Sequence, residues 1–342
     1  QRERARNARK DAGADAWKGE GSAAAGLPET VFTGYTQMQG DGKVLAIIQN
    51  GQQVDSAAEG AEVSVVLDTT PFYGEGGGQV GDTGVLEAEG VSVDVVDTTK
   101  HEGVYLHRAV VSEGTLNVGD TLTAKVDEHR RTAIMRNHTA AHLLQAALRK
   151  VLGSHVEQAG QLVNERHVRF DFTHFSALTP EELLQVENLV NQEILKAVPV
   201  SVQEMGIEEA RLSGAMALFG EKYGDVVRVV SVEDGFSKEL CGGTHMDNTA
   251  RLGLFKILSE SSVASGVRRI EGVTAMGVLD LLSVQMATLR DSARAMKVIN
   301  PMELPLHAQQ MMAQLKEKDK EIESLNAKLA QNRLDGVFQN AQ

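Results

Sequence analysis

Two short histidine-containing segments, far apart in the chain, constrain the fold most strongly. The first is His138-Thr139-Ala140-Ala141-His142, and the second is Cys241-Gly242-Gly243-Thr244-His245. The first pair lies on a predicted helix, so a spacing of four residues projects both imidazoles from one face. The second pair has the same spacing across a flexible Gly-Gly. If these side chains act together, the fold must bring the two segments to one point.

Together the pairs offer three imidazoles and one thiol, His138, His142, Cys241 and His245. This donor set suits tetrahedral Zn²⁺ at roughly 2.0–2.3 Å, and soft sulfur disfavours Mg²⁺ or Ca²⁺. Either pair alone also fits packing or chance, but the combination favours a metal. Thr139 excludes a zincin protease, which needs Glu directly after the first histidine.

The composition is that of a globular protein. The length of 342 residues suits two or three domains, the hydrophobic content of 42% is enough for real cores, and the net charge is −13. The single cysteine allows no internal disulfide and fits a reducing, cytoplasmic location. No apolar stretch predicts a membrane span, and the first residues do not resemble a signal peptide. The chain does not start with Met, and we expect a piece of a longer protein.

Residues 26–125 are predicted to form a small β-barrel or sandwich. Glycine, Asp and Asn separate short runs rich in Val and Ile, at intervals typical of such folds. The runs are Val44–Gln49, Ala61–Asp68, Val91–Asp97 and Val104–Val111. Residues 1–25 are predicted to be a helical lead-in from an upstream domain.

Residues 126–280 are predicted to be an α+β core, because helices and strands intermix without a βαβ repeat. A helix over 132–152 ends before Gly153, and a capping box with Pro180 opens another, from Thr179 to about Ala197. A further helix and three strands are predicted over Glu208–Phe219, Val163–Phe172, Val226–Val232 and Gly253–Ser259.

Residues 281–342 are predicted to be helical and to start a coiled coil. A heptad seam runs through Met311, Leu315, Lys318, Ile322, Leu325 and Leu329. The seam predicts a homodimer through 303–342, although a single amphipathic helix packed on its own domain would give the same pattern.

The histidine and cysteine motifs resemble those of the editing domain of alanyl-tRNA synthetases and its free-standing relatives. The resemblance covers about residues 30–342, with the helical lead-in, and its further motifs occur in the family's order. They are Thr70–Tyr73, Gly76–Asp82, Arg169–Phe172, Gly214–Tyr223 and Gly266–Glu271. The resemblance implies hydrolysis of mischarged tRNA(Ala) carrying serine or glycine, with Zn²⁺ as the cofactor and the tRNA acceptor end as the partner.

The resemblance also implies a role in substrate binding for Gln158, and the loop Gly76, Gly77 and Gly78 could let the backbone approach the tRNA end. Gln158 could equally be a surface residue, and the glycines a barrel turn. The candidate phosphate contacts are Arg130, Arg131, Arg136, Arg268 and Arg269, although the last two could simply be solvated. His155, His167 and His174 are interpreted as structural.

Two positions depart from the family's pattern. Ala141 stands where the family usually has Thr, and Gly76 stands where it often has Ser. Both changes remove a hydroxyl near the expected pocket. The four candidate ligands would fill a tetrahedral site. Either one ligand is therefore loose and the zinc activates water, or the zinc only positions the substrate.

A second hydrolytic site has a physical rationale in this family. A pocket for alanine rejects glycine by only about 1–3 kcal/mol and rejects an added hydroxyl poorly. Two other hypotheses are a free-standing deacylase and a zinc-stabilised tRNA-binding or dimerisation module without activity. The editing domain of threonyl-tRNA synthetase has a similar histidine and cysteine arrangement, but a heptad helix follows here where that enzyme has its catalytic domain.

Overall fold

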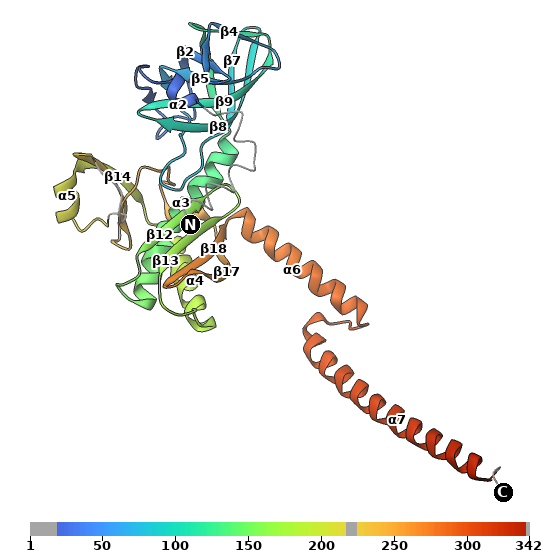
Figure 1. Cartoon of the computed structure of the whole chain (residues 1–342). Helices are drawn as coiled ribbons and strands as arrows, with labels where there is room; N and C mark the ends of the chain where they lie inside the picture. The colour runs from blue at the N-terminus through green and yellow to red at the C-terminus, as the bar shows by residue number, and fades with distance from the viewer. Residues whose placement is uncertain (1–18, 217–223, 340–342) are drawn as a thin grey trace. The chain divides into compact units, whose positions relative to one another are not determined.

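The structure, a computed structural model, describes residues 19–216 and 224–339 (Figure 1). The chain divides into two compact units, with the division between Val278 and Leu279. The first unit contains a barrel and an α+β core, and the second is helical. The predicted lead-in helix falls largely on residues 1–18, outside the described residues.

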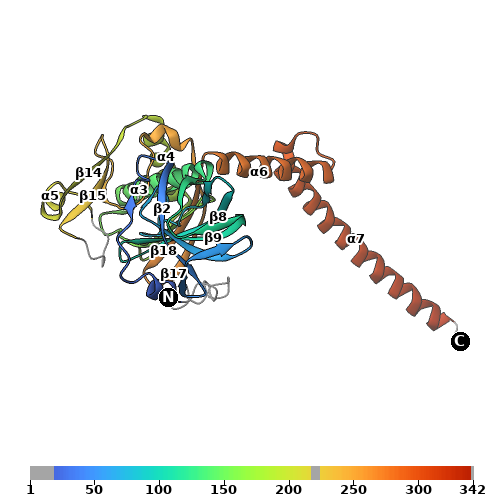
Figure 2. The same ribbon diagram turned by 90° about the horizontal axis from the view of Figure 1, so that it is seen from above.

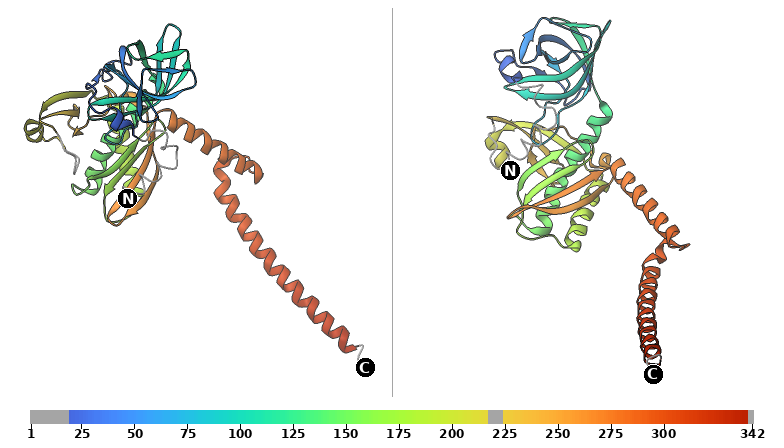
Figure 3. Two further views of the ribbon diagram at one scale, coloured as in Figure 1. Left: turned by 45° about the horizontal axis from the view of Figure 1, so that its top comes forward. Right: turned by 45° about the vertical axis from the view of Figure 1, so that its right-hand side comes forward.

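Six antiparallel strands close the barrel, in the order β11-β7-β8-β9-β5-β2, with β11 pairing back onto β2 (Figure 3). They are β2 (Gln39–Gln49), β5 (Glu62–Leu67), β7 (Gly84–Ala88), β8 (Val91–His101), β9 (Val104–Glu113) and β11 (Thr121–Val126). The short strand β3 (Gln52–Val54) pairs antiparallel with the end of β2. Aliphatic side chains such as Val63, Val65 and Leu86 fill the interior and are fully buried. The predicted small barrel is therefore confirmed.

Short elements complete the barrel region. They are α2 (Glu20–Ala23), the parallel pair β1 (Val31–Phe32) and β6 (Thr69–Thr70), and the antiparallel pair β4 (Ser56–Ala58) and β10 (Thr115–Asn117). The Glu20 carboxylate is buried and accepts hydrogen bonds from Ser64 and Arg108. These bonds tie the short helix to two barrel strands.

The α+β core is built on an antiparallel sheet in the order β12-β13-β18-β17, against which α3 (Glu128–Leu152) and α4 (Pro180–Leu195) pack (Figure 1). Its strands are β12 (Gln158–Val163), β13 (Val168–Thr173), β17 (Phe255–Ala264) and β18 (Val267–Thr274), and η1 (Thr249–Leu252) precedes β17. The apolar core between the layers includes Leu143, Phe170 and Phe172, which are fully or almost fully buried.

A second, three-stranded sheet belongs to the same unit. It has the order β14-β15-β16, with β14 (Val200–Gly206), β15 (Val226–Val232) and β16 (Lys238–Leu240). The short helix α5 (Ile207–Leu212) follows β14, and together they lie at the left of Figure 2. The loop that follows β16 carries the second ligand pair.

Helix α3 links the barrel to the core because it begins two residues after the last barrel strand. Asp127 caps it by accepting a hydrogen bond from Arg130 N at 2.9 Å, and Gly153 ends it with φ 117°. His138 and His142 lie in the middle of this helix, between its start beside the barrel and its end in the α+β core. Helix α4 has the predicted capping box of Thr179 and Glu182.

Two sequence predictions differ from the structure. The strand predicted over Val163–Phe172 is the turn and second half of the β12–β13 hairpin. Asn164 Oδ1 makes the turn by accepting from the backbone N–H groups of Arg166 and His167 at 2.9 Å. The helix predicted over Glu208–Phe219 ends at Leu212 and is followed by Gly214 at φ 81°; residues 217–219 lie outside the described range.

The second unit consists of most of α6 (Met276–Ala295), η2 (Pro301–Glu303) and α7 (Leu304–Gln339). The heptad residues lie within α7, and apolar ones such as Leu315 and Ile322 are more than half exposed. The coiled coil and the homodimer remain predictions. None of the helices in the described ranges is both long enough and apolar enough to cross a membrane.

His107 on β9 is a titratable group sealed inside the barrel. The Nδ1 atom donates to the Val65 carbonyl at 2.9 Å, so in the neutral ring Nε2 accepts from the Thr70 hydroxyl at 2.7 Å. The side chain is fully buried, and burial lowers the pKa of His107 to about 4.

This pKa predicts a stability change in mild acid. In the unfolded chain His107 titrates near its ordinary pKa of about 6.5, so between pH 6.5 and 4 only the unfolded state takes up the proton. The free energy of unfolding is therefore not reduced by His107 above pH 6.5, and it falls by about 3 kcal/mol through this residue as the pH is lowered to 4. We expect His107→Gln to lessen the loss of unfolding free energy in this window by about 3 kcal/mol, measured by urea titration of metal-free protein.

The matched control is His129→Gln, because His129 is exposed at the start of α3. It should keep the wild-type pH dependence. Equal losses of stability between pH 6.5 and 4 in wild type and His107→Gln would contradict the assignment.

Candidate metal centre

The four predicted ligands converge in the structure. Helix α3 supplies His138 and His142, the loop after β16 supplies Cys241 and His245, and one ligand atom from each lies within 4.8 Å of all the others. Cys241 Sγ is 3.4 Å from His138 Nε2 and 3.2 Å from His245 Nε2. A tetrahedral zinc ion holds N and S ligands about 3.6 Å apart, given its bond lengths. The donor set therefore fits a tetrahedral transition metal.

The three imidazoles are buried and neutral. Their exposed fractions are 1% for His138, 6% for His142 and 8% for His245. Burial, followed by nearby positive charge, lowers the pKa of His142 to about 3 and those of His138 and His245 well below their usual range. Neutral imidazole is the form that binds a metal.

Gln79 orients His138. Its Oε1 atom accepts from His138 Nδ1 at 2.7 Å and from the Thr244 N–H at 2.9 Å, and its Nε2 donates to the Thr244 hydroxyl at 2.9 Å. An amide oxygen can only accept, so His138 carries its proton on Nδ1 and presents a bare Nε2 to Cys241. Gln79 is fully buried and comes from the glycine-rich loop of the barrel.

Thr139 orients His245 in the same way. Its hydroxyl donates to the Met135 carbonyl at 2.9 Å, and its oxygen can therefore accept from His245 Nδ1 at 3.2 Å. That oxygen also accepts from the Met246 N–H at 3.0 Å. His245 Nε2 is thus left facing Cys241.

Glu239 lies beside the third imidazole. Its carboxylate is 3.7 Å from His142 Nδ1, an atom that has no hydrogen-bond partner among the described residues. Glu239 accepts from the Ser237 hydroxyl at 2.8 Å, and burial raises the pKa of its carboxyl to about 8. Carboxylates and carbonyls in such positions orient metal-bound histidines.

Arg228 and Tyr35 hold the loop that carries Cys241. Arg228 Nη1 donates to the carbonyls of Cys241 and Gly243 at 2.9 and 2.7 Å, and its guanidinium lies 4.1 Å from the Tyr35 ring centroid. The Tyr35 hydroxyl donates to the Gly242 carbonyl at 2.8 Å. The carbonyls of residues 241, 242 and 243 are therefore all held by hydrogen bonds, two from Arg228 on β15 and one from Tyr35 in the barrel region.

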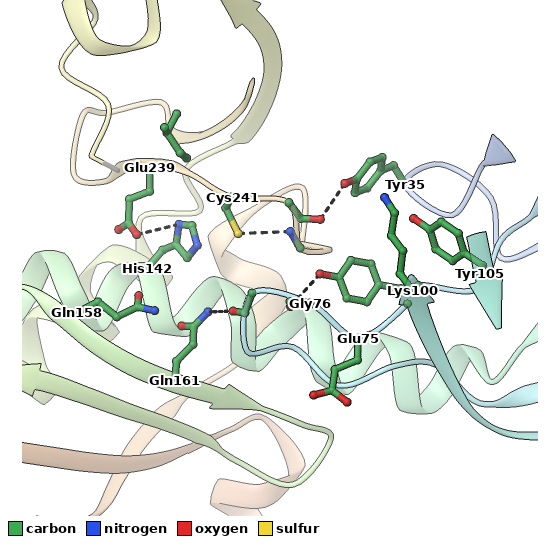
Figure 4. Close-up of a pocket in the computed structure, with 16 residues that line it drawn as sticks. Tyr35, Glu75, Gly76, Lys100, Tyr105, His142, Gln158, Gln161, Glu239 and Cys241 are labelled. Atoms are coloured by element: carbon green, nitrogen blue, oxygen red, sulfur yellow. Dashed lines mark hydrogen bonds and ion pairs between the residues drawn. The ribbon is translucent and has the colours of Figure 1, made fainter. Parts of the chain in front are cut away.

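A cavity of about 280 Å³ opens beside the ligands (Figure 4). Cys241, His142 and Gln158 line it, and so do Gly76 and Gly77. Gly78 does not line the cavity; its φ is 83°, and a Cβ there would lie 2.5 Å from the Gln161 side chain. The other lining residues are Tyr35, Tyr73, Gly74, Glu75, Lys100, Tyr105, Gln161, Glu239, Leu240, Gly242 and Gly243.

Ala141 lies away from this cavity. It is 1% exposed and packs in the apolar core of the α+β region. The expected loss of a hydroxyl from the pocket therefore applies to Gly76 and not to Ala141.

Arg131 has a structural position. It is fully buried, it forms an ion pair with Asp82, and it donates to the carbonyls of Gly34 and Pro71 at 2.8 and 2.9 Å. A guanidinium with these partners is not available to phosphate, and this burial removes Arg131 from the candidate tRNA contacts.

The other four arginines are placed differently. Arg268 pairs with Glu260, and Arg269 makes two 2.7 Å hydrogen bonds to Asp171, so both are engaged within the sheet. Arg130 lies 3.3 Å from Glu165 and donates to the Gly81 carbonyl. Arg136 is half-buried and donates its Nε to the Arg251 carbonyl at 2.9 Å, and it forms no ion pair with the residues that the structure describes.

Five residues of this site were not found from the sequence: Gln79, Thr139, Glu239, Arg228 and Tyr35. Each acts through a partner that is distant in the chain. Two of them had a visible clue, because Gln79 ends the glycine-rich loop and Thr139 follows a candidate ligand directly.

Two family models of aminoacyl-tRNA synthetases match parts of this chain. A family model described as "tRNA synthetases class II (A)" matches residues 1–130, and one described as "Threonyl and Alanyl tRNA synthetase second additional domain" matches residues 227–271. The second match includes Cys241 and His245.

Individual relatives match along almost the whole chain. The alanine–tRNA ligase of Acetivibrio thermocellus is 52% identical over 314 residues, which are 92% of this chain and 36% of the relative. That of Bacillus subtilis is 48% identical over 330 residues, 96% of this chain and 37% of the relative. That of Pelotomaculum thermopropionicum is 48% identical over 343 residues, which are 99% of this chain and 39% of the relative. The chain thus spans less than two fifths of these relatives.

The close approach of Gly243 to His138 gives a test of the ligand geometry. A Cβ at Gly243 would lie 2.1 Å from His138 Cε1 and 2.9 Å from Gln79 Oε1, so alanine must displace the imidazole. We expect Gly243→Ala to weaken the binding of Co²⁺, followed by its visible absorption, by roughly 10-fold or more.

Gly242→Ala is the matched control, because a Cβ at Gly242 meets nothing within 4 Å. It should bind Co²⁺ like wild type. Wild-type affinity in Gly243→Ala, with the protein folded, would show that His138 is not a ligand in this geometry.

Proposed function

The chain belongs to the alanyl-tRNA synthetase family, and we propose that its cavity hydrolyses the ester bond of tRNA(Ala) carrying serine or glycine. The observation that carries this proposal is a cluster of three imidazoles and a thiol, two members of which, His142 and Cys241, line a small cavity. The match to an additional domain shared by threonyl and alanyl enzymes supports it.

We propose that the cofactor is Zn²⁺, held by His138, His142, Cys241 and His245. The mixed nitrogen and sulfur set and the burial of the imidazoles favour zinc over Mg²⁺ or Ca²⁺. When bound, zinc supplies Lewis acidity at the inner end of the cavity. Gln79 and Thr139 support this set by holding the Nδ1 atoms of two ligands.

Gln158 is proposed to recognise the aminoacyl group. It lines the cavity with His142 and Cys241, and its amide can bond to the amine or the hydroxyl of a seryl ester. Alanine would leave the polar partner of the serine hydroxyl unpaired, and such sites can discriminate by about 10⁴-fold. Gly76 and Gly77 also line the cavity, and the absence of a side chain there allows close approach of the ester to the backbone.

The proposed partner is the acceptor end of tRNA(Ala), in the cytoplasm. Among the predicted arginines, Arg136 fits best as a phosphate contact, because it is partly exposed and, among the described residues, hydrogen-bonds a carbonyl and pairs with no carboxylate. The homodimer proposed through 303–342 would use the exposed heptad seam of α7.

The direct test is release of amino acid from Ser-tRNA(Ala), with Ala-tRNA(Ala) beside it. We expect chelator-sensitive release of serine and sparing of alanine. His142→Ala should lower the rate by roughly 100-fold, because it removes one of four ligands. His129→Ala, a change on the same helix at an exposed residue outside the cluster, should leave the rate unchanged.

A scaffold without activity would behave differently. It would bind zinc but release the amino acid from neither Ser-tRNA(Ala) nor Ala-tRNA(Ala), and chelation would unfold the chain. Wild-type activity in His142→Ala would likewise sink the proposed mechanism.

A further inference from the structure

The cavity has two chemically different ends (Figure 4). His142, Gln158 and Glu239 lie at the end formed by the α+β core. Lys100 and Tyr105 lie at the end formed by the barrel, with Cys241 between the two groups. A substrate that links an aminoacyl group to a nucleotide also has two chemically different ends.

Two of the three lining tyrosines have their hydroxyls committed to the cavity wall. The Tyr35 hydroxyl donates to the Gly242 carbonyl at 2.8 Å, and the Tyr73 hydroxyl donates to the Gly76 carbonyl at 3.1 Å. They shape the wall. In Figure 4 no such bond joins the Tyr105 hydroxyl to another lining residue.

The Tyr105 ring is fixed while its hydroxyl faces the cavity. The ring stacks on Phe32 with centroids 5.5 Å apart and is 5% exposed, so its position on β9 is well defined. Burial raises the pKa of Tyr105 to about 12, which keeps the hydroxyl protonated as a donor at neutral pH.

Lys100 is a cation of the cavity whose ammonium forms no ion pair or hydrogen bond with the residues that the structure describes. It is exposed, it lies opposite Tyr105 in the β8–β9 ladder, and its Nζ is 5.2 Å from the Tyr105 ring centroid. Among the described residues that line the cavity it is the one lysine or arginine. Nearby Arg228 is already bound to two carbonyls. The Glu75 carboxylate, also a lining group, points away from the Lys100 ammonium in Figure 4.

We propose that Lys100 and Tyr105 form a subsite for the phosphate and sugar of the nucleotide that carries the aminoacyl ester. This inference rests on the proposed hydrolysis of aminoacyl-tRNA. The Lys100 ammonium pairs with the phosphate as a point charge, and the Tyr105 hydroxyl donates to a phosphate or ribose oxygen. The subsite places the ester between the barrel and the ligand cluster. Because it contacts only the nucleotide, it does not distinguish one amino acid from another.

The test compares two esters that differ in the phosphate. We expect Lys100→Met to raise the KM for Ser-tRNA(Ala) by roughly 5- to 10-fold at unchanged kcat, since uniform binding is lost. The KM for 3′-O-seryl adenosine, which lacks the phosphate, should stay at the wild-type value. Lys100→Arg should restore most of the loss, and added salt should narrow the difference between wild type and Lys100→Met.

Lys43→Met is the matched control, because Lys43 is an exposed barrel lysine outside the cavity. It should change neither KM. An equal KM shift for both esters in Lys100→Met, or a shift for neither, overturns the phosphate subsite. In either case the hydrolysis proposed above would stand.

A binding assay keeps the subsite testable without turnover. Wild-type protein should bind adenosine 5′-monophosphate more tightly than adenosine, and Lys100→Met should lose that preference. If wild type hydrolyses neither ester but shows the preference, the proposed function fails and the subsite stands. If wild type shows no preference for the phosphate, the subsite fails.

Discussion

The hydrogen bonds of Gln79 are the constraint on which the site depends. One buried amide from the barrel holds His138 on α3 and Thr244 in the loop between Cys241 and His245. Three segments that are distant in the chain therefore meet at one side chain. Leaving a buried partner of this kind unsatisfied costs about 1–3 kcal/mol. The glycines before Gln79 let the loop reach this point, because Gly78 has φ 83° and no room for a Cβ.

The same principle recurs around the cluster. Gln79, Thr139 and Glu239 each lie beside the Nδ1 atom of a different imidazole. For His138 and His245 this leaves Nε2 bare and directed at the thiol of Cys241. Meanwhile Arg228 and Tyr35 fix the carbonyls of the loop. The candidate ligands are thus held in place by groups that are not candidate ligands themselves, and such hydrogen-bonding neighbours tune metal sites.

Local patterns carried much of what could be predicted. The spacing of His138, His142, Cys241 and His245 predicted a cluster of four side chains that the fold brings together, and Thr179 with Glu182 predicted the start of α4. The barrel followed from short strands punctuated by glycine. These features depend on residues that are close in sequence, or on a donor chemistry that is rare elsewhere in the chain.

Tertiary partners explain what could not be predicted. Arg131 stands in a basic run and resembles a surface cation until Asp82 is placed beside it. Apolar residues stand on both sides of the Asn164 turn, so the end of β12, the turn and β13 were predicted as one strand. Lys100 and Tyr105 became a candidate subsite only when the structure showed that the barrel wall and the histidine and cysteine cluster share one cavity.

The most direct test of the proposed metal centre is X-ray absorption at the zinc edge of the zinc-loaded protein. We expect a first shell of three nitrogens at about 2.0–2.1 Å and one sulfur at about 2.3 Å. A shell of nitrogen and oxygen without sulfur would show that the four side chains do not form one site.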